Sequence, residues 1–345
     1  MRVIAITTMR NEAPHCLEWF AHHQSIGIEH FIVYSNDCDD GTTEILDRLQ
    51  SIGLVSHIPQ PAPKGRKSIQ WQALKHAQSH PKLASADWAT VIDCDEFINL
   101  RAPFETIQDL ISAFPEGSDA IAMRWRLFGN NGHISAPMLT TTQAYTSAAP
   151  ERINLPLAHF FKSLFRVKAF RQLGIHRPKH RKSKPAQWVD GDGSILPKEF
   201  ATDDDRINLF GYPGGSALVQ LNHYSIRSTQ NFITKRARGL PNKRSREIGL
   251  EYWVERNFNT EEESSISRLN KTSQKHLTTL LADNMLSQLH SDAINWHQRS
   301  FEHAMQNADL VQLFWHLTLA DQSTPPQPNL ARAHLSRLRS LNSSA

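Results

Sequence analysis

The amino-acid sequence predicts an α/β fold whose parallel sheet is covered by helices, followed by a helical C-terminal extension. Three observations favour it: apolar runs alternate with helical patterns over the first 100 or so residues, polar clusters follow several of these runs, and only helical spacing remains after about residue 272. With 345 residues, 39% of them hydrophobic, the chain can bury a sizeable core in a large domain plus a smaller appendage.

The first part of the chain predicts strands and helices in strict alternation. Each expected strand is a short apolar run, and each expected helix has apolar residues three or four positions apart. In chain order, the expected elements are a strand at 3–7, a helix at 14–26, a strand at 30–34, a helix at 43–51, a strand at 55–58, a helix at 69–78 and a strand at 88–92. Ligands of open α/β sheets bind beyond the carboxyl ends of the strands, so polar residues 8–12, 35–42 and 93–96 mark the expected binding edge.

After about residue 100, the sequence first predicts strands separated by long loops and then predicts helices. Strand-like runs at 120–125, 160–167 and 217–221 alternate with long polar loops. From about residue 272 to residue 319 the apolar residues recur at helical spacing. We therefore expect a domain at 1–250, divided into halves at 1–100 and 101–250, and a helical extension at 251–345.

Composition and cysteine usage favour a cytoplasmic protein. No run approaches the ~18 apolar residues of a membrane helix, and the apolar stretch at 3–6 is shorter than a signal peptide needs, so it is interpreted as the first core strand. Cys16, Cys38 and Cys94 lack paired metal-ligand spacing and predict neither disulfides nor a zinc site. A reducing cytoplasm fits best, with peripheral contact at the inner face of the membrane as an open alternative.

Charge is unevenly distributed along a chain whose net charge is only +4. Residues 152–189 and 206–246 carry many lysines and arginines but no aspartate or glutamate. Such stretches can hold phosphates, although a solvated basic face is an equally ordinary interpretation.

A pair of carboxylates is the sharpest chemical signal in the sequence. Asp93, Cys94 and Asp95 follow directly on an expected strand. Alternating carboxylates at a strand end offer oxygen ligands to Mg²⁺ or Mn²⁺, and such a cation neutralises the charge that develops on a departing diphosphate. Carboxylates in this position also serve as helix caps, so the pattern alone leaves both interpretations open.

Six segments of the first 240 residues resemble family 2 glycosyltransferases and, more narrowly, the branch related to family 92. They are TMRNE at 8–12, HFIVYSNDCDDGT at 30–42, DCDEF at 93–97, KSLFR at 162–166, GIHRP at 174–178 and NHYSIRS at 222–228. Each segment is weakly specific, but their order and spacing together are more so. The resemblance implies a GT-A fold with a Rossmann-like, mixed central sheet.

The same resemblance implies roles for five residues at the expected binding edge. Asn11, Glu12 and Asp37 would line the nucleoside pocket, with Asp37 near the base; Asp93 would face the ribose, and Asp95 the metal ion. Simpler interpretations remain: residues 11–12 can cap the following helix, and residues 37–42 can form a tight turn.

Further cofactor-binding candidates are mostly basic. Arg66 and Gln70 lie where the family packs a segment along the donor, and Arg227, Lys235 and Arg238 follow on an expected helix that could cover the diphosphate. Solvent-facing basic residues are the alternative in both places.

Two histidines and one aspartate complete the predicted site. GT-A enzymes often take a third metal ligand from a downstream histidine, and His223 is the best match, with a buried structural imidazole as the alternative. An inverting reaction needs a general base, and no clear Glu-Asp pair is present for it. Asp190 and His176 are the candidates, although the Asp190-Gly191 pair is also a turn signal.

The sequence as a whole favours a metal-dependent, inverting glycosyltransferase. It would move a sugar from a nucleotide-diphospho-sugar, with Mn²⁺ or Mg²⁺, to a glycan, a lipid-linked acceptor or another acceptor. A nucleotidyltransferase and a non-enzymatic nucleic-acid-binding protein are the alternatives. The chain has neither a glycine-rich triphosphate loop nor a recognisable RNA- or DNA-reading motif, so we expect no nucleic-acid partner.

Overall fold

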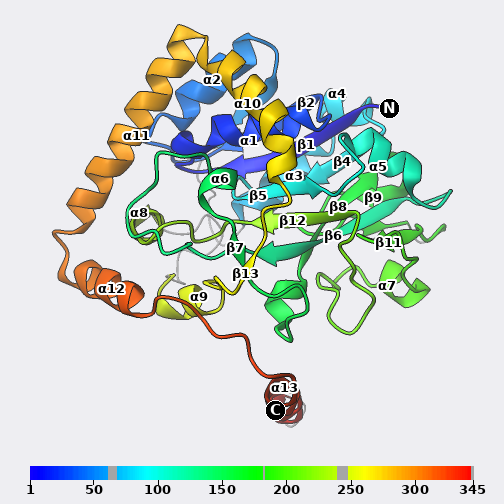
Figure 1. The fold of residues 1–345 in the computed structure, drawn as a ribbon. Coiled ribbons are helices and arrows are strands. Elements are labelled where there is room, and N and C mark those ends of the chain that lie inside the picture. Colours follow the sequence, from blue (N-terminus) through cyan, green and yellow to red (C-terminus); the bar gives the residue numbers. More distant parts are fainter. Residues whose placement is uncertain (61–67, 182, 239–247, 343–345) are drawn as a thin grey trace.

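The computed structural model describes residues 1–60, 68–181, 183–238 and 248–342, and a nine-stranded sheet forms its centre (Figure 1). The strands of this sheet are β1 (Val3–Met9), β2 (His30–Ser35), β3 (Val55–Pro59), β4 (Trp88–Val91), β5 (Glu96–Leu100), β6 (Ala120–Leu127), β8 (Phe161–Arg166), β11 (Trp188–Asp190) and β12 (Val219–His223). Their order is β3-β2-β1-β4-β8-β6-β12-β5, and β11 pairs with β6 beside this path. Two short pairs lie outside it: β9 (Phe170–Gln172) with β10 (Lys179–His180), and β7 (Ser147–Ala148) with β13 (Glu261–Glu262).

Strand direction changes across the sheet. β1, β2, β3 and β4 are parallel to one another, whereas β8 runs antiparallel to both β4 and β6, and β5 runs antiparallel to β12. The sheet therefore joins a parallel, Rossmann-like half to a mixed half. This confirms the mixed α/β fold class.

Helices cover both faces of the sheet. They are α1 (Ala13–Ser25), α2 (Thr42–Ser51), α3 (Ile69–Ala77), α4 (Pro81–Ala84), α5 (Ile107–Ala113), α6 (Thr141–Ala144), α7 (Lys198–Thr202), α8 (Thr229–Arg238), α9 (Leu250–Val254), α10 (Ser267–Leu281), α11 (Asn284–Ala304), α12 (Ala308–Leu319) and α13 (Pro328–Asn342), with 3₁₀ turns at Pro156–His159 and Val167–Ala169. The strands and helices expected before residue 100 are present, with bounds that differ by at most two residues.

Alternate side chains of β1 point to opposite faces of the sheet, so this strand contributes to two hydrophobic cores. Val3 and Ala5 face the side covered by α1, α2, α10 and α11, whereas Ile4 and Ile6 pack with Leu74 of α3 on the other side. Because both faces are covered, the strand is buried almost throughout and reads as a continuous apolar run.

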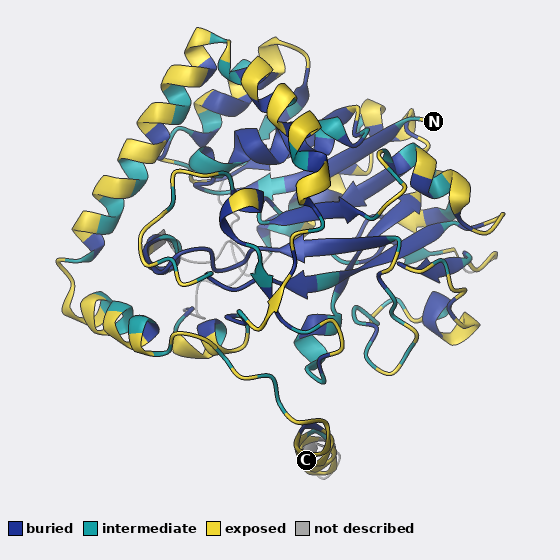
Figure 2. Ribbon diagram, in the orientation of Figure 1, coloured by how far each residue is buried: buried dark blue, intermediate teal, exposed yellow. Residues whose placement is uncertain are grey.

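The helices after residue 250 pack against the first half of the chain. α10 lies along α1, and its residues Leu277 and Leu280 belong to the same core as Trp19 of α1 (Figure 1). α11 contacts α1, α2 and α8, while α13 lies apart at the end of an extended segment (Figure 2). The helical C-terminal extension is confirmed, and the domain boundary at residue 250 stays a prediction. No helix of the described residues is long and apolar enough to cross a membrane.

Candidate functional site

The polar segments predicted to share an edge of the sheet do meet there. Met9 at the end of β1 pairs with Ser35 at the end of β2, and Val91 at the end of β4 pairs with Ile6. On the mixed side, His223 at the end of β12 pairs with Glu96 at the start of β5. The parallel half thus delivers residues 10–12, 36–40 and 93–95 to the same edge, and β12 adds residues 224–227.

Three of the predicted site residues hold an unusual backbone conformation at this edge. Asn11, Asp37 and Arg227 have φ angles of 51°, 47° and 51°. A positive φ is tolerated by Asn and Asp but is uncommon for a residue such as Arg, so the surrounding contacts must hold it. Asn11 is fixed by Asp39, whose backbone N–H donates to its side-chain oxygen (3.0 Å) and whose carboxylate accepts from its Nδ2 (2.5 Å). The Asp37 carboxylate is exposed beside them.

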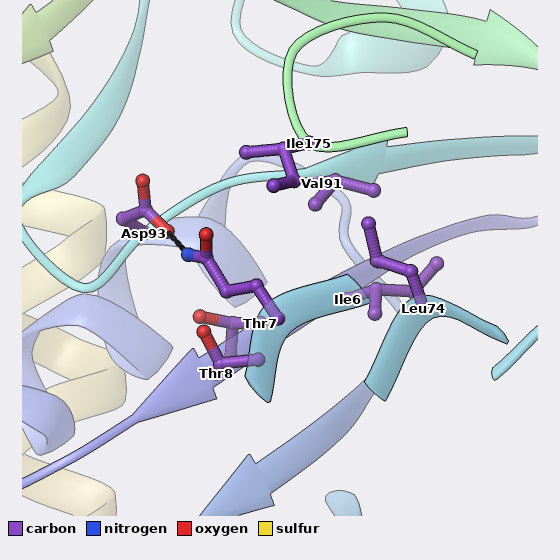
Figure 3. Close-up of a pocket in the computed structure, with 8 residues that line it drawn as sticks. Ile6, Thr7, Thr8, Leu74, Val91, Asp93 and Ile175 are labelled. Carbon is purple, nitrogen blue, oxygen red and sulfur yellow. Dashed lines mark hydrogen bonds between the residues drawn. The ribbon is translucent and has the colours of Figure 1, made fainter. Parts of the chain in front are cut away.

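The Asp93 carboxylate accepts hydrogen bonds from two side chains, one from helix α3 and one from strand β8. Gln70 at the start of α3 donates from Nε2 to Asp93 Oδ1 (3.1 Å), and Lys162 of β8 donates from Nζ to Asp93 Oδ2 (2.9 Å). Figure 3 shows the first of these bonds beside a small pocket that Thr7, Thr8 and Ile175 also line. Gln70, predicted to lie along the donor, is therefore in direct contact with Asp93.

A buried ion cluster lies beneath Asp93, and the sequence reasoning assigned neither of its other members a role. Lys162 is completely buried and lies 2.9 Å from Asp93 and 3.5 Å from Glu96. Burial alone would lower the pKa of Lys162, but the charges of Asp93 and Glu96 outweigh it and raise that pKa to about 12. Glu96 accepts from the Asp93 backbone N–H (2.8 Å) and from Trp125 Nε1 (2.7 Å). One feature of the sequence could have identified this cluster: Lys162 lies inside an apolar, strand-like run. A lysine is almost never buried without a charged partner, so its position predicts a nearby carboxylate.

Asp95 faces a second lysine and a histidine. Lys235 of α8 donates from Nζ to Asp95 Oδ2 (2.9 Å), and His223 Nε2 lies 3.6 Å from Asp95 Oδ1. Burial opposes ionisation of Asp95, yet the charge of Lys235 and the contact with His223 hold its pKa well below the ordinary value. Burial lowers the pKa of His223, which keeps the imidazole neutral at neutral pH.

Arg227 joins the two halves of the site. Its Nη1 lies 3.5 Å from Glu12 Oε2, and its Nη2 donates to the carbonyl of Cys94 (3.3 Å). The predicted residues Glu12, Arg227 and Lys235 also line one small pocket of about 20 Å³. Two cations, Arg227 and Lys235, thus stand at the Asp95 side of the sheet edge.

The two predicted general bases lie in different places. His176 is near the site: its ring centroid is 5.7 Å from that of Trp125, which in turn lies 4.1 Å from that of His223. Its Nδ1–H donates to the carbonyl of Phe161 (2.9 Å), and burial lowers its pKa to about 4.

Asp190 is not brought to this edge. It pairs with Ala122 in β6, whereas His223 pairs with Leu127, five residues further along the same strand and so about 16 Å away. Its carboxylate accepts backbone N–H bonds from Asp192, Ser194 and Gly215. The turn signal at 190–191 explains this arrangement: the side chain organises its own loop.

The predicted metal ligands converge only in part. Asp95 and His223 face each other, whereas Asp93 is turned toward Lys162 and Gln70. Within residues 1–60, 68–181, 183–238 and 248–342, no group of three or more His, Cys, Asp or Glu side chains is arranged to hold a metal ion. Arg66 lies outside the described residues; Arg238 ends α8, and its side chain is not described.

Comparison with known proteins places the chain in a family. The family model for glycosyltransferase family 92 matches residues 3–195, which include the first strand, both carboxylates of the Asp93–Asp95 pair and Lys162. The chain belongs to glycosyltransferase family 92. The narrower part of the sequence resemblance is therefore confirmed.

Relatives in this family share a limited part of their length with the chain. A glycosyltransferase family 92 protein of Oryza sativa subsp. japonica is 29% identical over 151 residues, which cover 42% of this chain and 25% of that protein. One of Ricinus communis is 28% identical over 161 residues, covering 43% and 27%. The chain thus spans about a quarter of the length of these relatives. A crystal structure titled S. aureus TarS 1-349 matches 93% of this chain and 88% of its own, at 14% identity and a TM-score of 0.33, too low to add to the fold described above.

Proposed function

We propose that this family 92 chain is a glycosyltransferase that moves a sugar from a nucleotide-diphospho-sugar to an acceptor hydroxyl. The observation that carries the proposal is the pairing of each carboxylate of the Asp93–Asp95 motif with a cation at the carboxyl edge of the sheet, with Arg227 beside them. A site of this kind combines hydrogen-bond acceptors for a ribose with positive charge for a diphosphate.

The diphosphate is assigned to Arg227 and Lys235. Both line the pocket beside Glu12, and both are held by acidic or carbonyl partners that fix their positions. When the bond to the sugar breaks, negative charge grows on the departing nucleoside diphosphate. Cations already in place stabilise that charge without reorganisation.

A divalent ion fits beside them at Asp95 and His223. The oxygen and nitrogen that face each other are ligands suited to Mn²⁺, and their 3.6 Å separation is close to the ~3 Å between adjacent ligands with bonds of about 2.1 Å. Lys235 contacts the other carboxylate oxygen, Oδ2, so Oδ1 remains turned toward His223. A bound ion would supply further neutralisation of the diphosphate. Metal dependence is part of the proposal, with Asp95 and His223 as ligands and Asp93 outside that pair.

The nucleoside is assigned to the loops after β1 and β2. Asn11 and Asp37 are held in left-handed conformations there, and the exposed carboxylate of Asp37 is available to a base. The ribose is assigned to Asp93, which accepts a hydrogen bond from Gln70. The acceptor is a glycan or a lipid-linked molecule, with inversion at the transferred sugar.

His176 is the better candidate for the general base, and its position supports it over Asp190. The rings of His176 and His223 both lie against the ring of Trp125. Asp190 is distant from His223, and its carboxylate accepts hydrogen bonds from three backbone N–H groups. A pKa of about 4 is low for a base that works at neutral pH, so a nearby diphosphate would have to raise it before His176 could act efficiently.

A panel of nucleotides with and without Mn²⁺ tests the proposal. A ligand at about 100 times its dissociation constant stabilises a protein by about 2.7 kcal/mol, so melting curves with each nucleoside diphosphate identify the preferred base. We expect the shift to grow with Mn²⁺, and we expect this Mn²⁺-dependent increase to disappear in Asp95→Ala, with the apo protein still folded. Stabilisation by nucleoside triphosphates or oligonucleotides alone would instead favour the nucleotidyltransferase or nucleic-acid-binding alternative.

A further inference from the structure

A cavity of about 240 Å³ lies next to the proposed diphosphate pocket, between α1, α8, α11 and the segment 136–141. The two spaces share four lining residues: His15, Asn231, Thr234 and His297. The cavity is therefore adjacent to the pocket that holds Arg227 and Lys235. None of the predicted site residues whose side chains the structure describes lines it.

The lining of this cavity combines neutral hydrogen-bonding groups with aliphatic surfaces. Asn231, Thr141 and Gln230 supply neutral polar groups, and Leu277 and Ile294 supply apolar ones.

Among the residues that the structure describes, the cavity lining contains one carboxylate, that of Glu18. It accepts from the backbone N–H groups of Thr141 (2.7 Å) and Thr142 (3.0 Å). Burial lowers the pKa of His290, although a hydrogen bond to the Ala13 backbone opposes the shift, so this imidazole is neutral at neutral pH.

The walls of the cavity are fixed in place. Gln230 of α8 accepts from the Ala136 backbone N–H (2.9 Å) and donates from Nε2 to Gln298 of α11 (2.6 Å). On the other side His297 of α11 lies 2.9 Å from the buried carboxylate of Asp40, in the loop that also carries Asp37. α11 is thus tied to both the cavity wall and the nucleoside loop. A preformed space of this kind binds a ligand with little ordering cost.

We infer that this cavity binds one neutral saccharide residue. Its size is a little below the ~300–1,000 Å³ of pockets that take drug-sized ligands, which suits a single sugar ring. Sugars present hydroxyl groups that both donate and accept, together with apolar C–H faces, and the lining offers partners for both. The inference deepens the proposed function, on which it rests: the sugar belongs either to the acceptor or to the donor.

The test fills the cavity from α11 with Ile294→Trp. Ile294 is 41% exposed, so the larger side chain can be accommodated without disturbing the core, and Leu139→Trp, from the opposite wall, is an independent second variant at a 60% exposed residue. Met285→Trp, at a 58% exposed residue of the same helix that does not line the cavity, is the matched control. Ligand-observed NMR measures binding of methyl glycosides of glucose, galactose, mannose and N-acetylglucosamine, and calorimetry measures binding of nucleoside diphosphates and nucleotide-sugars.

An acceptor site predicts that at least one glycoside binds the wild type and the control, and binds about tenfold or more weakly to both filled variants, while nucleotide-sugar affinity is unchanged. A donor-sugar site predicts instead that the filled variants bind nucleotide-sugars no better than the bare diphosphates. The inference is overturned if the filled variants bind glycosides and nucleotide-sugars as tightly as the control does. It is also overturned if the wild type binds neither glycosides nor nucleotide-sugars. If the wild type binds a glycoside but no nucleotide, and both filled variants fail to bind that glycoside, the saccharide site stands and the proposed nucleotide-sugar donor is refuted.

Discussion

Removing the buried lysine beneath Asp93 gives the most demanding test of the site. Lys162→Met keeps the length of the side chain and removes its charge, leaving Asp93 without the cation 2.9 Å away. Breaking a buried ion pair costs about 3 to 5 kcal/mol, and because the Asp93 side chain is 34% exposed, part of its charge is solvated and we expect a loss of about 2 to 4 kcal/mol. The comparable change at exposed Lys184, Lys184→Met, should stay within about 0.5 kcal/mol.

The same substitution should change how stability depends on pH. Burial raises the pKa of Glu96 although the charge of Lys162 opposes the shift, so ionising Glu96 costs more in the folded than in the unfolded protein, and stability falls as pH rises above the ordinary carboxyl range. Without Lys162 the pKa of Glu96 rises further. The deficit of Lys162→Met should therefore widen at alkaline pH.

Urea unfolding of wild type, Lys162→Met, Asp93→Asn and the double variant, at acidic, neutral and alkaline pH, measures these effects. If the lysine acts by neutralising Asp93, the double variant should recover part of the stability that Lys162→Met loses. A deficit no larger than that of Lys184→Met, or a deficit that narrows as pH rises, would refute the reasoning.

Three further substitutions separate binding, metal and structural roles. Asp37→Ala should weaken nucleotide binding more than it lowers turnover at saturating donor, because it removes an interaction made equally in ground and transition states; a lower turnover at unchanged donor affinity would contradict this. His223→Ala should raise the Mn²⁺ requirement, and it should also lower the apo melting temperature because the ring is buried against Trp125. An unchanged Mn²⁺ affinity would make the imidazole structural only. Asp190→Ala should cost about 1 to 3 kcal/mol in urea unfolding, since three backbone N–H groups lose their acceptor, while transfer by the folded protein continues; full stability with abolished transfer would restore Asp190 as the base.

Much of the fold could be predicted because the necessary signals are local. The four parallel strands are short, mostly apolar runs, three of which precede a polar cluster, and the helices between them show apolar residues three or four apart. The antiparallel placement of β8 between β4 and β6 has no such local signal. It depends on pairing between segments far apart in the chain, which the period of a single strand does not encode.

The sequence by itself determined that Asp93 and Asp95 stand at the end of a buried strand, beside the loops of Asn11 and Asp37. Only the tertiary structure decided which charges meet them. Lys162 lies 69 positions from Asp93, and Lys235 lies 140 positions from Asp95, yet each donates a hydrogen bond of 2.9 Å. Asp190, a comparable aspartate by sequence, is directed into its own turn, about five strand residues from the site. The physical reason is that a buried carboxylate needs a partner, while the sequence does not state which distant cation the folded sheet will bring within reach.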